Sequence, residues 1–335
     1  MDEALNSTVH PACIQEPPLA LDAIKQLDLF GVCQYCVLTF MSCVSLLLYL
    51  ELCLYIYKKM PYPKKTKVIW INGAAPVISI MACFGMWIPR AIMFTDMTSS
   101  CYFAVVVYKV LLLLIEEFGG CNAFLKRFAG EPFMISTGPC CCCCPCIPRV
   151  PMSRRMLFML RAASLQYAIL KTTFSVFSII LWTNGIYDPF NLNIAGVAIW
   201  IGLFVGVLTI ISLWPVAIIF MNTNKHLRSV KIIPKYAMYQ LVLVLSQLQT
   251  SIINILALNG VIACSPPFSS QARGSKLSQQ LMIMEMFIIT LVNRLLYHRP
   301  YDAVLPEERD NPQNNHNHNH NSGVVVQAAV VEHDV

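Results

Sequence analysis

Residues 194–221 read IAGVAIWIGLFVGVLTIISLWPVAIIFM, an apolar run that contains no charged side chain. A helix needs about 20 consecutive apolar residues to cross the hydrocarbon core of a bilayer. This run is therefore long enough to span a membrane. Its Trp214-Pro215 pair, near the end of the run, predicts a kink or a tilt.

Six further apolar runs of similar length lie on either side of this one, at 34–57, 68–89, 100–118, 157–183, 235–260 and 277–297. Charged residues make up only 13% of the chain, and its mean hydropathy is +0.59. A soluble domain carries about 25% charged residues, so that class is excluded. The runs also lack the alternation of a membrane barrel. We predict an all-α membrane protein, a bundle of seven transmembrane helices. Its third span, ending at Glu116-Glu117, is expected to be the shortest.

The basic residues predict how the chain lies in the membrane, because cytosolic loops are enriched in lysine and arginine. The odd-numbered loops hold fourteen of them: Lys58, Lys59, Lys64, Lys65, Lys67, Lys126, Arg127, Arg149, Arg154, Arg155, Lys225, Arg228, Lys231 and Lys235. The amino terminus is then outside and the carboxyl terminus cytosolic. The Asn6-Ser7-Thr8 sequon falls outside on this count, which makes Asn6 a candidate glycosylation site.

This orientation divides the chain into three parts. Residues 1–33 form an extracellular segment without a cleavable signal peptide, and residues 34–298 form the seven-span domain. A cytosolic loop at 119–156 interrupts that domain, and its first part, 121–128, mixes apolar and basic residues and could lie in the membrane interface. Residues 299–335 form a polar tail, rich in His and Asn, that we expect to be disordered.

Six cysteines lie within seven residues of the cytosolic loop: Cys140, Cys141, Cys142, Cys143, Cys144 and Cys146. Zinc fits them poorly, because structural zinc sites space their thiols so that the chain can turn around the ion. Cysteines with basic neighbours beside a membrane span are common sites of S-acylation, and we favour that interpretation over free thiols or a metal site. No bound cofactor is expected.

Three other cysteines fall on the predicted outer side: Cys13, Cys101 and Cys264. A disulfide between Cys13 and Cys264 is slightly favoured, and three free thiols are the alternative. On the fifth span, Gly202 and Gly206 form a small-x3-small pair that lets another helix approach closely. A neighbour in the same bundle is the more common partner of such a pair.

Ionisable side chains within the spans cost several kcal/mol in hydrocarbon and usually serve a pathway or a pair. The candidate pathway residues are Glu116, Lys171, Gln166, Tyr167, Gln249, Glu285, Arg294, Arg90 and Lys109. In one interpretation, Lys109 or Lys171 pairs with Glu116 or Glu285 and holds the bundle together. In the other, Lys171 attracts the acidic group of an amphipathic substrate. Arg90 and Arg294 lie near helix ends and could simply snorkel to the interface.

Two other classes fit the residues less well. A G-protein-coupled receptor would carry Asp-Arg-Tyr after its third span and Asn-Pro-x-x-Tyr in its last, and neither is present. A membrane acyltransferase would need a nucleophile beside a base, and the cysteine loop has no histidine. A seven-span scaffold or trafficking protein without transport activity stays open as the alternative to a carrier.

Six separated motifs carry a resemblance to a known family. They are 83–90 (CFGMWIPR), 118–120 (FGG), 137–139 (TGP) before the cysteines, 166–168 (QYA) with Lys171, 185–189 (GIYDP) and 262–267 (IACSPP). Together, over about residues 30–300, they resemble the alpha subunit of the organic solute transporter. The chain departs from that pattern at Lys109, at Glu117 and in its His/Asn-rich tail.

This resemblance implies a facilitative carrier of bile acids, steroid conjugates and related amphipathic anions. It also implies a separate single-span beta subunit as partner and a place in the plasma membrane, commonly the basolateral one, after maturation in the endoplasmic reticulum. Membrane lipid is expected around the spans, and no nucleic acid is expected as a partner.

Overall fold

The structure is a computed structural model that describes residues 19–25, 27–135, 149–187, 196–224, 226, 232–264 and 268–298. Within these ranges, seven helical segments are long and apolar enough to cross a membrane: 29–59, 64–87, 89–116, 154–183, 197–223, 234–257 and 270–297. They contain 24 to 31 residues. At 1.5 Å per residue, even the shortest exceeds the ~30 Å hydrocarbon core. The predicted all-α seven-span bundle is confirmed.

The described ranges contain the following elements in chain order: α1 (Ala20–Lys25), α2 (Leu29–Lys59), α3 (Lys64–Asn72), α4 (Ala74–Trp87), the 3-10 turn η2 (Pro89–Ala91), α5 (Ile92–Glu116), α6 (Cys121–Arg127), β1 (Pro132–Phe133), β2 (Val150–Pro151), α7 (Arg154–Thr183), α8 (Val197–Thr223), α9 (Ile232–Val244), the π-helical segment η3 (Leu245–Gln249), α10 (Thr250–Leu258) and α11 (Ser270–Tyr297). Four of them, α1, α6, β1 and β2, lie outside the spans. Elements α3 and α4 together form the second span, and α9, η3 and α10 form the sixth.

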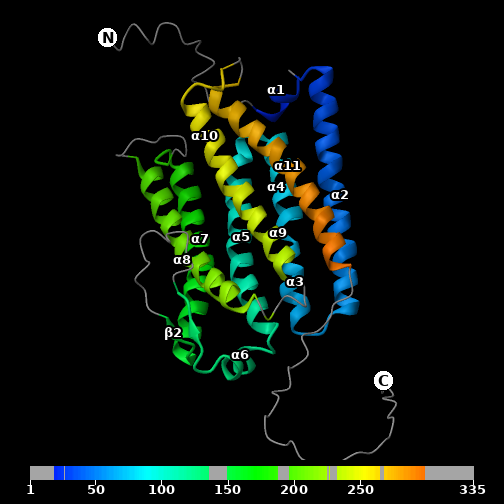
Figure 1. Cartoon of the computed structure of the whole chain (residues 1–335). Helices are drawn as coiled ribbons and strands as arrows, with labels where there is room; N and C mark the ends of the chain where they lie inside the picture. The colour runs from blue at the N-terminus through cyan, green and yellow to red at the C-terminus, as the bar shows by residue number, and fades with distance from the viewer. Residues whose placement is uncertain are drawn as a thin grey trace, which may run out of the picture. The chain divides into compact units, whose positions relative to one another are not determined.

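The helix α5 lies in the middle of the bundle, with α4 packed on one side and α7 on the other (Figure 1). In turn, α11 packs against both α4 and α2, and α8 packs against α7. We call the end where α2 ends and α3 begins the basic end, since Lys58, Lys59, Lys64 and Lys67 lie there together with α6 and the short β1–β2 pair.

Small polar residues mark the contacts between these helices. Ser79 of α4 donates a hydrogen bond to Ser42 of α2 at 3.3 Å, and Ser164 of α7 donates to the Ser212 carbonyl of α8 at 3.0 Å. All four side chains are buried. Small side chains let backbones approach closely in lipid, where no hydrophobic driving force holds helices together.

The third span is not the shortest, contrary to the prediction. It begins at Pro89 and contains 28 residues, whereas the second and sixth contain 24 each. Hydropathy placed its start at residue 100 because the stretch 95–100, Thr-Asp-Met-Thr-Ser-Ser, is polar. That stretch is nevertheless helical, and its residues Asp96, Ser99 and Ser100 line a cavity between spans.

The loop after α5 begins at two glycines with positive φ, Gly119 at 88° and Gly120 at 90°. Side chains rarely adopt this conformation, which ends α5 and starts α6. The phenylalanines Phe124 and Phe128 are then buried against Phe118 and Phe133. The segment 121–128, a candidate for lying in the membrane interface, thus packs its aromatic side chains into the protein.

Candidate functional site

Four spans line a cavity of about 150 Å³ in the half of the bundle away from the basic end, and its lining residues Asp96, Gln247 and Ser251 are exposed. Its polar lining comes from α5, from η3 and α10, and from α11, while α4 contributes small and apolar side chains. The lining residues are Ile78, Ala82, Asp96, Ser99, Ser100, Phe103, Ser246, Gln247, Thr250, Ser251, Ser278, Gln279 and Met282. A polar cavity between spans is the usual form of a solute site in a membrane carrier.

A π-helical irregularity in the sixth span supplies part of this lining. Between α9 and α10 the chain forms the π-helical segment η3, and its residues Ser246 and Gln247 face the cavity. Short π-helical segments within α-helices are rare and occur often at functional sites. The polar groups of the sixth span therefore gather where its helix is irregular.

The carboxylate of Asp96 is the one acidic group among the cavity's lining residues. The amide nitrogen of Gln279, from α11, donates a hydrogen bond to it at 2.9 Å. Within the described ranges, no lysine, arginine or histidine side chain forms an ion pair with Asp96. Since a charged group in hydrocarbon usually pairs or serves a pathway, Asp96 has the features of a pathway residue.

A second acid in the middle of the bundle has the same kind of partner. The amide of Gln249, at the end of η3, lies 2.7 Å from both carboxylate oxygens of Glu285 on α11. This contact joins the sixth span to the seventh, and the contact between Gln279 and Asp96 joins the seventh to the third. Neutral amides thus contact both carboxylates across helix boundaries.

Aromatic side chains close the cavity on the side facing the basic end. The rings of Phe103 and Tyr239 are stacked with centroids 5.8 Å apart, and both side chains are buried. Beyond them lies a second cavity of about 10 Å³, lined by Phe103 and Tyr239 together with polar residues such as Asn72, Lys235 and Asn293. Such a volume holds about one water molecule. Phe103 and Tyr239 therefore separate two polar spaces along one axis of the bundle.

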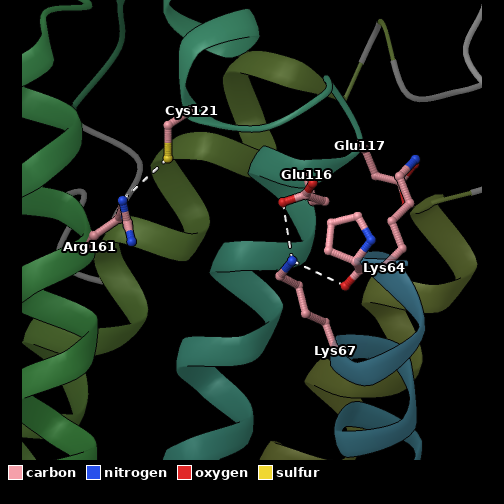
Figure 2. A network of polar contacts seen from close by, with 7 residues as sticks. Lys64, Lys67, Glu116, Glu117, Cys121 and Arg161 are labelled. Atoms are coloured by element: carbon pink, nitrogen blue, oxygen red, sulfur yellow. Dashed lines mark hydrogen bonds and ion pairs between the residues drawn. The ribbon is translucent and has the colours of Figure 1, made fainter. Parts of the chain in front are cut away.

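Ion pairs join the helices at the basic end, as Figure 2 shows. Lys64 lies 2.9 Å from the Glu117 carboxylate, and Lys67 lies 3.1 Å from that of Glu116. The side chain of Glu117 is only 2% exposed, so its charge depends on its partners. In the same view, Arg161 of α7 donates a hydrogen bond to the Cys121 thiol at 3.3 Å. The second and third spans are tied together at this end.

The predicted pathway residues are not brought together in one site. Tyr167 is buried and lies 3.2 Å from Thr209 of α8, while Lys171 is half-buried one turn further along α7. Gln166, beside Tyr167, is also half-buried, and none of the three lines the cavity. Exposed Arg90 lies in η2.

The interpretation in which Lys109 or Lys171 pairs with Glu116 or Glu285 does not fit the contacts of the described residues. Glu116 pairs with Lys67, and Glu285 contacts Gln249. Lys109 instead lies over the Trp70 ring, 5.9 Å from its centroid. Hydropathy does not determine how each helix is oriented about its own axis. It therefore cannot predict which face of a span meets which neighbour.

Arg294 does not merely snorkel to the interface. Its guanidinium forms an ion pair with Glu51 of α2, and His298 contacts the same carboxylate at 3.1 Å. The ring of His298 also stacks on Tyr55, with the centroids 4.2 Å apart. The first and seventh spans are therefore joined by a polar cluster.

Sequence reasoning missed Asp96, Gln279 and the serines that surround them. Asp96, Ser99, Ser100 and Phe103 recur at helical spacing on one face of α5, and this pattern was a usable signal. Hydropathy began the third span at residue 100, so Asp96 and Ser99 fell outside the predicted span.

Several predicted modification sites lie outside the described residues: Asn6, Cys13, Cys140, Cys141, Cys142, Cys143, Cys144 and Cys146. Cys264 is disulfide-bonded, whereas Cys101 is a free thiol. The pairing of Cys264 with Cys13 stays a prediction.

The glycines of the fifth span face open space. A side-chain carbon built at Gly202 or Gly206 would meet no described atom within 4 Å. The expectation that this small-x3-small face contacts a neighbour in the same bundle is therefore wrong within the described part of the chain.

Seven apolar helices define a multi-pass helical membrane protein, and a polar cavity between spans is a common feature of membrane transporters. Residues 33–303 match the family model described as Organic solute transporter Ostalpha. The chain belongs to this family, which supports a role as a solute transporter.

Relatives from several vertebrates match most of the chain. It is 62% identical to an organic solute transporter subunit alpha of Danio rerio over 90% of this chain and 92% of that protein. It is 39% identical to the Leucoraja erinaceus subunit alpha, over 88% of this chain and 84% of that protein. It is 37% identical to the Homo sapiens subunit alpha, over 92% of this chain and 91% of that protein. The word subunit in these names implies a partner protein. No solved structure gives a significant match.

Proposed function

We propose that this chain is the alpha subunit of a heteromeric facilitative transporter that carries bile acids, steroid conjugates and other amphipathic organic anions. Its partner is a single-span beta subunit, and its place is the plasma membrane, on the basolateral side of epithelia, after maturation in the endoplasmic reticulum. Membership of the family supports transport of an organic solute. The substrate class and the partner rest on the resemblance of the motifs.

The observation that carries this proposal is the cavity of about 150 Å³ between the second, third, sixth and seventh spans. Polar groups enclosed in a bilayer are costly, so a carrier places them where the solute replaces water. The Phe103–Tyr239 stack closes the cavity toward the basic end. A carrier needs such a closure, because a continuous polar path would act as a channel.

The basic end faces the cytosol in this proposal, and the cavity lies in the outer half of the membrane. The fourteen lysines and arginines of the odd-numbered loops support this orientation. The cysteine run of the loop 119–156 is then cytosolic, where its thiols stay reduced and open to acylation.

The proposed transport is passive. Coupled transporters bind their ions at clustered carboxylates or at broken helices near the midplane. Here Asp96 and Glu285 each contact a neutral amide, that of Gln279 or Gln249, rather than another carboxylate. We therefore expect net flux to follow the gradient of the substrate.

Uptake in cells tests the proposal. Taurocholate and a steroid sulfate are offered to cells that express this chain alone, a beta subunit alone, or both. We expect saturable uptake above background only when both are present, unchanged when choline replaces sodium. An antibody against the tail 299–335 should bind only permeabilised cells. If both chains reach the surface and neither compound enters, the chain is a scaffold or trafficking protein instead.

A further inference from the structure

The cavity presents many more hydrogen-bond acceptors than donors. Four of its hydroxyl groups use their protons on carbonyls of their own helices: Ser99 on Thr95, Ser246 on Leu243, Thr250 on Ser246 and Ser251 on Gln247, at 2.7–3.2 Å. A hydroxyl has one proton and two lone pairs. These four oxygens can therefore accept a hydrogen bond from a solute but have no proton left to give it.

The remaining groups strengthen this imbalance. Ser278 lies 3.3 Å from the Thr250 oxygen, and since the Thr250 proton is used, Ser278 is the donor of that contact. Gln279 uses one amide hydrogen on Asp96. The Asp96 carboxylate accepts at both of its oxygens, and one contact leaves most of that capacity unused. Donors toward the cavity come mainly from Ser100 and Gln247.

Such a lining repels an anion. A sulfonate or carboxylate carries only acceptors, and here it would meet a carboxylate and no lysine or arginine among the lining residues. Lys171, which the sequence analysis proposed as the cation that attracts the acidic group of a substrate, lies on α7 outside the cavity. A neutral hydroxyl group, in contrast, donates its proton to the carboxylate in a charge-assisted hydrogen bond.

We propose that the cavity binds the hydroxyl groups of a steroid substrate, with Asp96 as the acceptor and Gln279 holding its carboxylate in place, while the anionic head stays outside the cavity. This inference rests on the proposed function and adds a specificity determinant to it. The site then selects substrates by the number and position of their hydroxyl groups. A site built to bind a hydroxyl discriminates strongly against an analogue without it, because its own polar groups are left unpaired.

The test uses two conjugated steroid acids that share one anionic head and differ only in hydroxylation, one trihydroxylated and one monohydroxylated. Uptake by cells expressing the chain with a beta subunit is measured for Asp96→Leu and Asp96→Asn. Asp96→Leu should lower kcat/KM for the trihydroxylated compound at least tenfold more than for the other. Asp96→Asn keeps an acceptor oxygen and the contact with Gln279, so it should retain most of the wild-type preference.

The matched control is Thr98→Leu, two residues away on the exposed face of α5, which should change neither uptake nor preference. Should Asp96→Leu fail to reach the surface, Asp96→Ala, which also removes the acceptor, decides by the same loss of preference relative to wild type. Equal loss of both compounds, or a preference unaffected by Asp96, overturns the inference while the proposed function stands. Sodium-dependent uptake that Asp96→Asn abolishes also overturns it, since the cavity would then hold a cation. Failure of the wild type to carry either compound counts against the proposed function itself.

Discussion

At the scale of single residues, Gly73 allows a close contact between the second span and two tyrosine side chains. Gly73 separates α3 from α4, and a side-chain carbon there would lie 2.3 Å from the Tyr102 hydroxyl and 2.8 Å from that of Tyr49. These hydroxyls donate to the carbonyls of Trp70 and Ile69, in the last turn of α3. Close approach at Gly73 thus lets two tyrosine hydroxyls reach carbonyls in the last turn of α3.

We expect Gly73→Ala to destabilise the protein by about 1–3 kcal/mol, the usual cost of forcing a methyl group into a filled space. The added carbon would displace both tyrosine hydroxyls from their acceptors. The measurement is the midpoint of thermal unfolding of the purified chain in detergent. Gly206→Ala is the matched control, since its site is open and alanine suits a helix better than glycine. A Gly73→Ala midpoint equal to that of the control would contradict the packing described here.

At the scale of elements, short segments of two spans carry much of the polar chemistry. The sixth span contains the π-helical segment η3, and the third, which begins at Pro89, contains the polar stretch 95–100 near its start. Both contribute to the cavity. The loop after α5 is likewise ordered by its packing, because Trp214 of α8 donates to the Ile135 carbonyl at 2.8 Å and Asn222 pairs with the backbone of Met134. The chain is therefore held at the basic end just before the cysteine run begins.

The cysteine run of this loop should be acylated. Replacing Cys140, Cys141, Cys142, Cys143, Cys144 and Cys146 with Ser should abolish hydroxylamine-sensitive acyl labelling. Each methylene of a bound acyl chain adds about 0.8 kcal/mol of membrane affinity. Seven spans already anchor the protein, so the variant should still reach the membrane, yet mature slowly or transport poorly. Cys43→Ser, at an exposed cysteine in the middle of α2, should keep full labelling. Mass spectrometry that finds only free thiols or bound zinc in the wild-type loop would contradict this assignment.

At the scale of the whole molecule, the sequence predicted the architecture better than the site. Runs such as 194–221 are apolar on every side, and this property alone predicts a span. Hydropathy carries no information on how each helix is rotated about its axis. The pairing of Glu116 with Lys67 rather than Lys109, and the contact of Glu285 with Gln249, depend on that rotation. Asp96 was not predicted, because a charged residue lowers the mean hydropathy of the span that contains it.

The central claim is that an organic anion crosses the membrane passively between the second, third, sixth and seventh spans, with its hydroxylated part in the cavity and its charged head outside it. The most direct measurement is flux of a labelled conjugated steroid through liposomes that contain the purified chain and a beta subunit, without sodium. We predict equal initial rates of influx and efflux under opposite gradients, no accumulation above equilibrium, and a loss of at least tenfold in Ser100→Leu but not in Thr98→Leu. Sodium-driven accumulation, or full flux in Ser100→Leu, would contradict the account.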